Sequence, residues 1–385
     1  MKKRILAIVL STVMALSMVA CGGGAAETPA DTATEAPAED AAAETEAEAE
    51  APAETAGEAY HFEVLVKSFQ STYWQAAVKG IEQACAELGV TANCNGPANE
   101  SDIADQVQML DAAIEAAPDG IGLAACDTSS VLDSLAVALE KGIPVVCFDT
   151  GVADAPEGSV LATVATDNVA AGACAATNMF PYIEAKIAAA TADAPVRIGE
   201  VNQDATALNI QQRGLGFINE MIKLCNEAGK KVAVEGNEFY VNAAEGAVTE
   251  GAEVIIEVGV PAQTTVDLAS TEANKIMSKA DTIAIFGSNQ TTAEGVITAN
   301  QTLNVLGADG IIAAGFDAGT PQKAAIKAGQ LVGSVTQSPL MQGYHCIYTL
   351  VDICNGETVE DMPMDGYWYN TENMEADDIA PNLYD

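Results

Sequence analysis

The chain has 385 residues, and its 55 acidic residues outnumber the 16 basic ones, which gives a formal net charge of −39. So negative a surface repels the phosphates of nucleic acids and of anionic lipids, which excludes DNA and RNA as partners. The part of the chain that follows the first 59 residues is too long for one ordinary hydrophobic core and suits two domains.

Residues 1–20 have the pattern of an export signal. The basic segment K-K-R precedes an apolar stretch from Ile5 to Met18 that is too short to span a membrane comfortably. The stretch ends in M-V-A-C, which resembles the lipobox of bacterial lipoproteins and implies lipidation of Cys21. An ordinary secretory signal with Cys21 placed by chance is the alternative. The lipobox reading predicts an exported protein, lipid-anchored at the outer face of a Gram-positive cytoplasmic membrane or periplasmic.

Residues 21–59 are predicted to be a flexible tether. The segment is rich in Ala, Glu, Thr and Pro, contains eleven acidic residues and has no basic one. Such a composition buries too little apolar surface to fold, and its charges repel one another. An acidic interaction tail is the alternative interpretation.

The remaining cysteines do not predict a metal site. No C-x-x-C pair occurs, and the chain has only two histidines, so we expect neither a metal ion nor another cofactor. Buried free thiols are favoured over disulfides, although the pattern leaves their state open. These cysteines are Cys85, Cys94, Cys126, Cys147, Cys174, Cys225, Cys346 and Cys354.

Short apolar runs alternate with amphipathic segments along the rest of the chain, a pattern typical of right-handed βαβ units and parallel sheets. In the first half we predict strands at 62–66, 90–94, 120–126, 144–148 and 160–164, and helices at 73–88, 102–116 and 130–140. In the second half we predict strands at 196–201, 231–234, 253–260, 282–286, 311–316, 332–336 and 366–369, and helices at 211–227, 266–279, 292–300, 321–328 and 340–354. Residues 236–251 receive no assignment.

Several short motifs occur in an order that resembles the ribose-binding-protein branch of the periplasmic binding proteins of sugar ABC transporters. They are K-S-F-Q-S-T-Y-W (67–74), G-I-P-V-V-C-F-D (142–149), A-T-D-N (165–168), Q-Q-R-G-L-G-F (211–217), I-F-G-S-N (285–289), G-F-D (315–317) and G-S-V-T-Q-S-P (333–339).

The resemblance implies an α/β fold of two doubly wound, Rossmann-like parallel-sheet lobes, joined by a three-segment hinge with a ligand cleft between them. The N-terminal lobe would comprise residues 60–165 and 338–365, and the C-terminal lobe residues 166–337 and 366–385. Hinge bending would close the cleft on the ligand.

The resemblance also implies the ligand contacts. Tyr73 and Trp74 match the two aromatics that bracket the sugar ring in this family, and Gln70 and Ser71 fall where it has a polar contact. The other matched positions are Asp149, Asn289, Asp317 and Gln337. Gln211 stands where the family has its ligand-reading Arg, while Arg213 matches a second, more structural Arg. A site without an Arg suits a neutral, hydroxyl-rich ligand, because an anionic ligand would need a cation.

The resemblance thus implies a monomeric, lipid-anchored solute-binding protein that hands a neutral sugar or polyol to a membrane permease. A receptor for a small signalling molecule or nucleoside, feeding a chemoreceptor or sensor, is the alternative. We expect no enzyme, because the sequence has no G-x-S-x-G, Walker or H-E-x-x-H motif.

Overall fold

The computed structural model describes residues 59–384. The predicted export signal, the predicted lipidation site Cys21 and nearly all of the predicted tether lie outside this range. Residues Ala56–Asp385 form one compact unit, to which both sheets and all the hydrophobic cores belong. This unit therefore contains what a chain needs to fold by itself.

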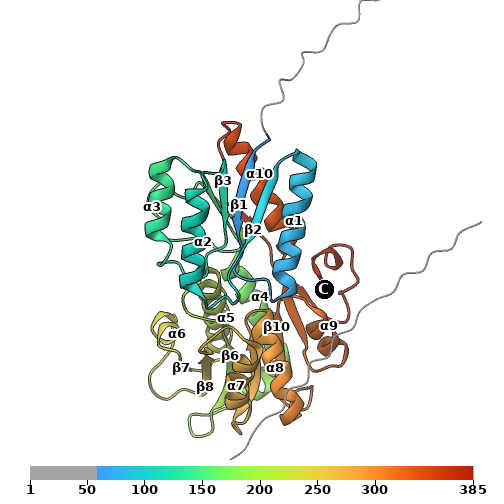
Figure 1. Cartoon of the computed structure of the whole chain (residues 1–385). Coiled ribbons are helices and arrows are strands. Elements are labelled where there is room, and N and C mark those ends of the chain that lie inside the picture. The colour runs from blue at the N-terminus through green and yellow to red at the C-terminus, as the bar shows by residue number, and fades with distance from the viewer. Residues whose placement is uncertain (1–58, 385) are drawn as a thin grey trace, which may run out of the picture. The chain divides into compact units, whose positions relative to one another are not determined.

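A six-stranded sheet forms the first lobe, and all its strand pairs are parallel (Figure 1). Its central strands are apolar and buried on both faces, as parallel strands covered by helices must be. From edge to edge the order is β12 (Met362–Met364), β5 (Ala162–Thr166), β4 (Val145–Phe148), β3 (Gly120–Leu123), β1 (His61–Leu65) and β2 (Thr91–Asn95).

A seven-stranded sheet forms the second lobe. Its strands are parallel except for the last one in the chain, which pairs antiparallel at one edge. The order is β13 (Tyr367–Tyr369), β11 (Gly333–Thr336), β10 (Ile312–Phe316), β9 (Thr282–Gly287), β6 (Val196–Val201), β8 (Val254–Gly259) and β7 (Val232–Gly236).

Helices pack on both faces of each sheet, so the predicted architecture of two doubly wound α/β lobes is confirmed. The first lobe carries α1 (Thr72–Leu88) with α10 (Pro339–Cys354) and α2 (Ile103–Glu115) with α3 (Leu132–Lys141). The second carries α4 (Asn168–Ala189) with α5 (Leu208–Glu227), α7 (Val266–Met277) with α8 (Gln290–Leu303), and the shorter α6 (Glu238–Ala243) and α9 (Thr320–Lys327). A 3-10 turn, Ala380–Asn382, lies near the C-terminus.

The predicted ranges leave out the helices α4 and α6, the strand β12 and the 3-10 turn Ala380–Asn382. The strand β12 has only the residues M-P-M, two of them exposed, so no alternating pattern marks it. The helix α6 lies within residues 236–251 and begins at Asn237, whose side chain accepts a hydrogen bond from Phe239 N at 3.0 Å.

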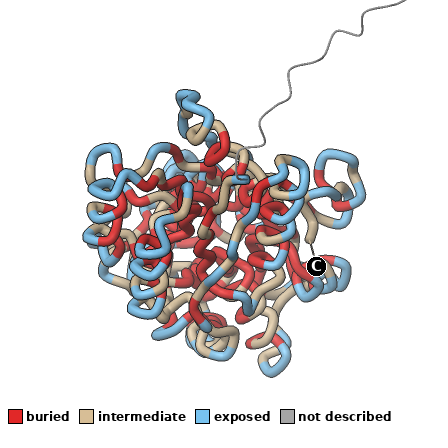
Figure 2. Tube along the Cα trace, turned by 45° about the horizontal axis from the view of Figure 1, so that its top comes forward, coloured by how far each residue is buried: buried red, intermediate tan, exposed pale blue. Residues whose placement is uncertain are grey.

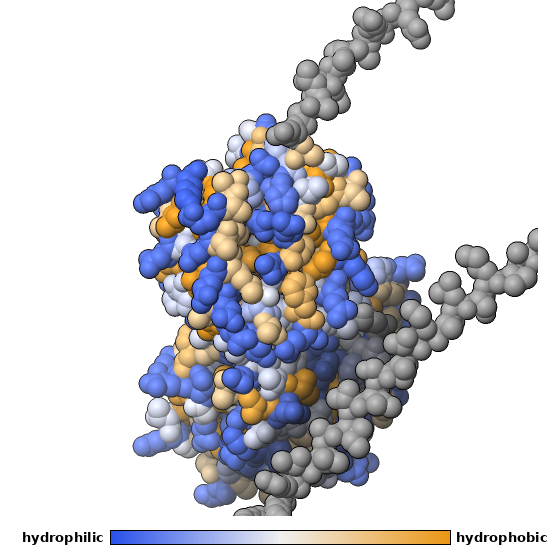
Figure 3. Space-filling view, viewed as in Figure 1, coloured by the Kyte–Doolittle hydropathy of each residue, from blue (hydrophilic) through white to orange (hydrophobic). Residues whose placement is uncertain are grey.

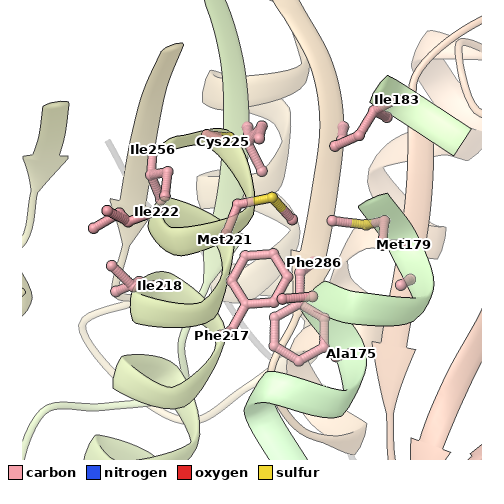
Figure 4. Close-up of a cluster of buried hydrophobic side chains, with 14 of the residues drawn as sticks. Ala175, Met179, Ile183, Phe217, Ile218, Met221, Ile222, Cys225, Ile256 and Phe286 are labelled. Carbon is pink, nitrogen blue, oxygen red and sulfur yellow. The ribbon is translucent and has the colours of Figure 1, made fainter. Parts of the chain in front are cut away.

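Buried residues gather in the interior of the molecule, while exposed residues lie along its outside, many of them in the outer turns (Figure 2). In the second lobe, Phe217 of α5 stacks on Phe286 of β9 with 4.5 Å between ring centroids, and Met221 and Met179 pack nearby (Figure 4). Figure 3 shows that the visible face is mainly hydrophilic, with apolar residues in small separate groups.

The chain crosses between the lobes three times, from β5 to α4, from β11 to α10 and from β12 to β13. Hydrogen bonds join these crossings. Thr166 Oγ1 donates to Gln337 Oε1 at 2.7 Å, and Asp167 N donates to Met364 O at 2.8 Å. The crossings therefore lie side by side, as a hinge requires.

The eight cysteines of the described part are free thiols, four of them buried and four half-buried. Within residues 59–384, no group of three or more His, Cys, Asp or Glu side chains is arranged to hold a metal ion. None of the helices in this range combines the length and the apolar composition that crossing a bilayer requires.

Candidate functional site

Two aspartates follow equivalent strands of the two lobes. Asp149 comes directly after β4 and Asp317 directly after β10, and each is only 3% exposed. Both have a left-handed backbone, with φ of 63° and 68°, which few residues other than Gly adopt and which Asp tolerates better than most. Such conformations gather at ligand sites, and open α/β sheets bind ligands at the carboxyl ends of their strands.

The carboxylate of Asp149 is held by three side chains. The Tyr73 hydroxyl donates to Oδ1, and Asn209 Nδ2 donates to Oδ2 at 3.0 Å. Lys67 Nζ lies 3.3 Å from Oδ2 and also donates to Asn209 Oδ1. Burial lowers the pKa of Lys67, but the carboxylates of Asp149 and Glu100 outweigh burial and leave this pKa raised, so the ammonium stays charged.

Asp317 is held in a similar way from the second lobe. Gln337 Nε2 donates to Oδ1 at 2.7 Å, and Gln290 N donates to Oδ2 at 2.9 Å. Burial raises the pKa of Asp317, and the charge of Arg213 and the hydrogen bond from Gln337 oppose that rise. Asn209 and Gln337 thus present amide groups beside the two carboxylates.

The prediction of a site without an Arg is wrong, because Arg213 lines the cavity. Its guanidinium lies 3.7 Å from the centroid of the Phe316 ring and donates to Asn168 Oδ1 and to Ser288 O. Gln211, predicted to contact the ligand, lies outside the cavity and donates to Ala205 O at 2.8 Å. Residues two apart on a helix point about 200° apart, so Gln211 and Arg213 cannot both face the cavity.

The two rings of the predicted aromatic pair pack against each other. The rings of Tyr73 and Trp74 meet edge to face with 4.9 Å between centroids, which leaves no room for a sugar ring between them. Trp74 Nε1 donates to Glu100 Oε1 at 2.9 Å, and the indole also contacts Phe148. Both rings are almost fully buried, so they form a wall of the cavity rather than two sides of a slot.

The two polar residues before α1 lie at the mouth of the site. Ser71 and Gln70 line a groove of about 350 Å³ that continues from the cavity, and Gln70 Nε2 donates to Ala98 O at 2.6 Å. Thr264 from the second lobe lines the same groove and accepts a hydrogen bond from Asn99 Nδ2 at its carbonyl.

The inner cavity between the lobes has a volume of about 30 Å³, enough for about two water molecules and too small for a sugar. It is narrow because side chains of the two lobes bond across it, as Gln203 Nε2 does to Glu100 Oε2 at 2.9 Å. Seven predicted residues line it: Ser71, Tyr73, Trp74, Asp149, Asn289, Asp317 and Gln337. Sequence reasoning missed others, among them Lys67, Glu100, Gln203, Asn209, Arg213 and Gln290.

Charges in and around the cavity are nearly balanced. Burial raises the pKa of Glu100, and Lys67, Trp74 and Gln203 oppose that rise. Lys67 is paired with Asp149, and Arg213 faces Asp317, so each buried cation has a carboxylate close by. The groups of the site that can form hydrogen bonds with a ligand are therefore carboxylate oxygens, amides and hydroxyls, and these groups bind hydroxyl-bearing molecules.

A family profile described as a periplasmic binding protein domain matches residues 62–358, so the chain belongs to this family. The resemblance drawn from the seven motifs is therefore confirmed.

Individual relatives bear names that state a sugar. The chain is 24% identical to the D-allose-binding periplasmic protein of Escherichia coli, over 77% of this chain and 86% of that protein. It is 27% identical to the ribose import binding protein RbsB of Haemophilus influenzae, over 60% of this chain and 65% of that protein.

Among solved structures, a solute-binding protein of an ABC transporter from Agrobacterium vitis with bound D-fucose is 26% identical, with a TM-score of 0.69, over 84% of this chain and all of that one. A protein from Brachyspira murdochii described as an ABC transporter, LacI family transcriptional regulator, is 30% identical with a TM-score of 0.70 and covers 85% of this chain and 99% of that one.

Proposed function

We propose that this protein is a lipid-anchored solute-binding protein of an ABC importer, which captures a neutral sugar or polyol between its lobes. The observation that carries the proposal is the cavity at which Asp149 and Asp317 meet from opposite lobes, each at the end of a parallel strand and each beside an amide. Carboxylates and amides in this arrangement bind hydroxyl groups in fixed directions.

A neutral ligand fits the charges of the cavity. Lys67 is committed to Asp149 and Asn209, and Arg213 to Asn168 and a backbone carbonyl. An anionic ligand would have to compete with these partners for a cation, at a cost in desolvation. The sugars stated for the relatives, D-allose, ribose and D-fucose, agree with a hydroxyl-rich ligand.

We infer that the ligand enters at the groove near Ser71 and Gln70 and exchanges its hydroxyls for the side-chain bonds that now cross the cavity. Tyr73 and Trp74 would supply an apolar wall. The groups that bind hydroxyls would be Asp149, Asn289, Asp317 and Gln337, with Lys67, Asn209 and Arg213 beside them.

The remaining parts of the proposal concern transport. The lipid on Cys21 would hold the protein at the membrane, and residues 22–59 would let the monomeric binding unit reach its permease. The protein would deliver its ligand unchanged and catalyse no reaction.

The test of the ligand class is a thermal-shift screen of Ala56–Asp385 against pentoses, hexoses, polyols, nucleosides and sugar acids. A ligand at about 100 times its Kd stabilises the folded state by about 2.7 kcal/mol, which raises the melting temperature by several degrees. We expect a shift with a neutral sugar or polyol. Shifts with nucleosides alone would favour the receptor reading, and no shift with any compound would contradict the proposal.

Trp74→Phe tests the aromatic wall without emptying the core. The substitution keeps a ring against Phe148 but removes the indole N–H that holds Glu100, so we expect the Kd for the sugar to rise about tenfold. Trp368→Phe is the matched control, because Trp368 lies on β13 and outside the cavity. Equal affinities of the two variants would exclude Trp74 from the site.

Cys21→Ser tests the anchor. Without the thiol no lipid can be attached, so the variant should leave the membrane fraction in cell fractionation. Cys354→Ser, which changes a half-buried thiol of the folded unit, should stay with the membranes. Membrane association of Cys21→Ser would contradict the lipobox interpretation.

A further inference from the structure

The end of the chain returns to the junction of the lobes. After β13 the chain runs through the turn Ala380–Asn382, and its last described residues lie beside α9, at the level where the lobes meet (Figure 1). Two side chains of the second lobe fix this segment: Thr336 Oγ1 donates to Asn382 O at 2.7 Å, and Lys323 Nζ donates to Tyr384 O at 3.1 Å.

Tyr384 is the residue of this segment that reaches both lobes. Its ring meets the ring of Tyr73 edge to face, with 5.9 Å between centroids, and packs against the hydrophobic core that contains Tyr73 and Trp74. It also packs against the core of the second lobe formed around α7 and α8. Its hydroxyl accepts a hydrogen bond from Ala318 N at 3.3 Å.

These contacts connect Tyr384 to both aspartates of the cavity. On one side, Tyr73 carries the hydroxyl that donates to Asp149. On the other side, Ala318 follows Asp317, whose left-handed backbone must be held in place by its surroundings. Burial raises the pKa of the Tyr384 phenol, and the nearby charge of Asp317 adds to this, so the phenol stays neutral. Tyr384 therefore supports the tyrosine that holds one carboxylate and the backbone that carries the other.

We propose that Tyr384 is a positioning residue of the ligand site, and that residues 370–384 act as a strap that favours the closed lobes. The expected effect on ligand release rests on the proposed function, whereas the expected effect on how compact the ligand-free protein is does not. Opening the hinge separates Tyr73 from the second lobe, so it must break the contact with Tyr384. The strap should therefore slow release of the ligand and make the ligand-free protein more compact.

The test compares Tyr384→Ala and Tyr384→Phe with Tyr182→Ala and Tyr182→Phe in the unit Ala56–Asp385. Tyr182 is a matched control because it is 51% exposed on α4. The probes are D-allose, D-ribose and D-fucose, for which Kd and dissociation rate are measured, and the radius of gyration of the ligand-free protein is measured by small-angle scattering.

We expect Tyr384→Ala to release the sugar about ten times faster and to have a larger ligand-free radius of gyration than Tyr182→Ala. Tyr384→Phe keeps the ring contact, so its radius should match the unchanged protein while its Kd rises a few-fold through the freed Ala318 N–H. A merely structural role would lower the melting temperature of Tyr384→Ala without changing the dissociation rate or the radius.

The outcomes separate the two proposals. If Tyr384→Ala and Tyr182→Ala agree in dissociation rate and radius, the strap is overturned whatever the ligand. If the unchanged protein binds none of the three sugars while Tyr384→Ala is still the more expanded variant, the strap is supported and the proposed ligand class is not.

Discussion

The Asp149→Asn variant should lose about 10- to 100-fold in affinity for the sugar, because a hydrogen bond to a charged group contributes about 1.5–3 kcal/mol. Asparagine keeps the shape of the side chain but presents one oxygen where the carboxylate presents two. Tyr73 and Asn209 both donate to this carboxylate, so the substitution also disturbs two neighbours of the ligand. Isothermal titration with the sugar found in the screen measures the effect.

The same substitution should destabilise the protein. Lys67 is only 1% exposed, and Asp149 is the carboxylate within 3.3 Å of its ammonium group. Removing one partner of a buried ion pair leaves an uncompensated charge and costs about 3–5 kcal/mol. Denaturant unfolding at neutral pH measures this loss, with Asp133→Asn, an exposed position of α3, as the control that should change neither stability nor affinity.

A double substitution separates the two effects of Asp149→Asn. Adding Lys67→Met removes the stranded cation and should recover much of the lost stability, because an apolar replacement of a buried pair is often close to neutral. It should not recover binding. Normal affinity in either variant would place the ligand site elsewhere, and a stability unchanged by Asp149→Asn would contradict the ion pair.

Local patterns predict most of this fold because its helices and strands follow their own periodicity. The strand β6 coincides with the predicted 196–201, and α1 and α10 begin within one residue of their predicted starts. The strand β12 could not be predicted in this way, because a three-residue edge strand is held only by its pairing with β5, and nothing in M-P-M encodes that pairing.

The residues of the site, too, can be predicted from the sequence only where a local pattern marks them. Asp149 and Asp317 are visible in the sequence because each ends an apolar run, where a carboxylate is unexpected. Lys67 gives no such signal, since its partners Asp149 and Asn209 are far away in the sequence. Arg213 and Gln211 differ only in which way they point from α5, which depends on how the helix packs.

The buried carboxyl group of Glu200 should make the stability of the protein depend on pH. The side chain lies on β6 and is fully buried, and neither carboxyl oxygen has a hydrogen-bond partner within the described residues. Burial raises its pKa well above that of an ordinary Glu. As pH rises above the usual range of a Glu carboxyl, the unfolded chain gives up this proton while the folded chain keeps it. Folding therefore becomes less favourable as pH rises, by about 1.4 kcal/mol for each pH unit in that window.

Glu200→Gln should remove this slope, because glutamine does not titrate and has nearly the same shape. We expect the difference in unfolding free energy between the variant and the unchanged protein to grow in favour of the variant as pH rises from about 4.5 toward neutrality. Urea unfolding at a series of pH values measures it, and Glu184→Gln, an exposed position of α4, should give a flat difference. A flat difference for Glu200→Gln would mean that Glu200 ionises in the folded protein as readily as in the unfolded chain. A buried carboxylate needs a partner, so that result would require a hydrogen-bond donor or a cation beside Glu200. Glu200 faces Gly214 of α5, the residue that follows the cavity-lining Arg213.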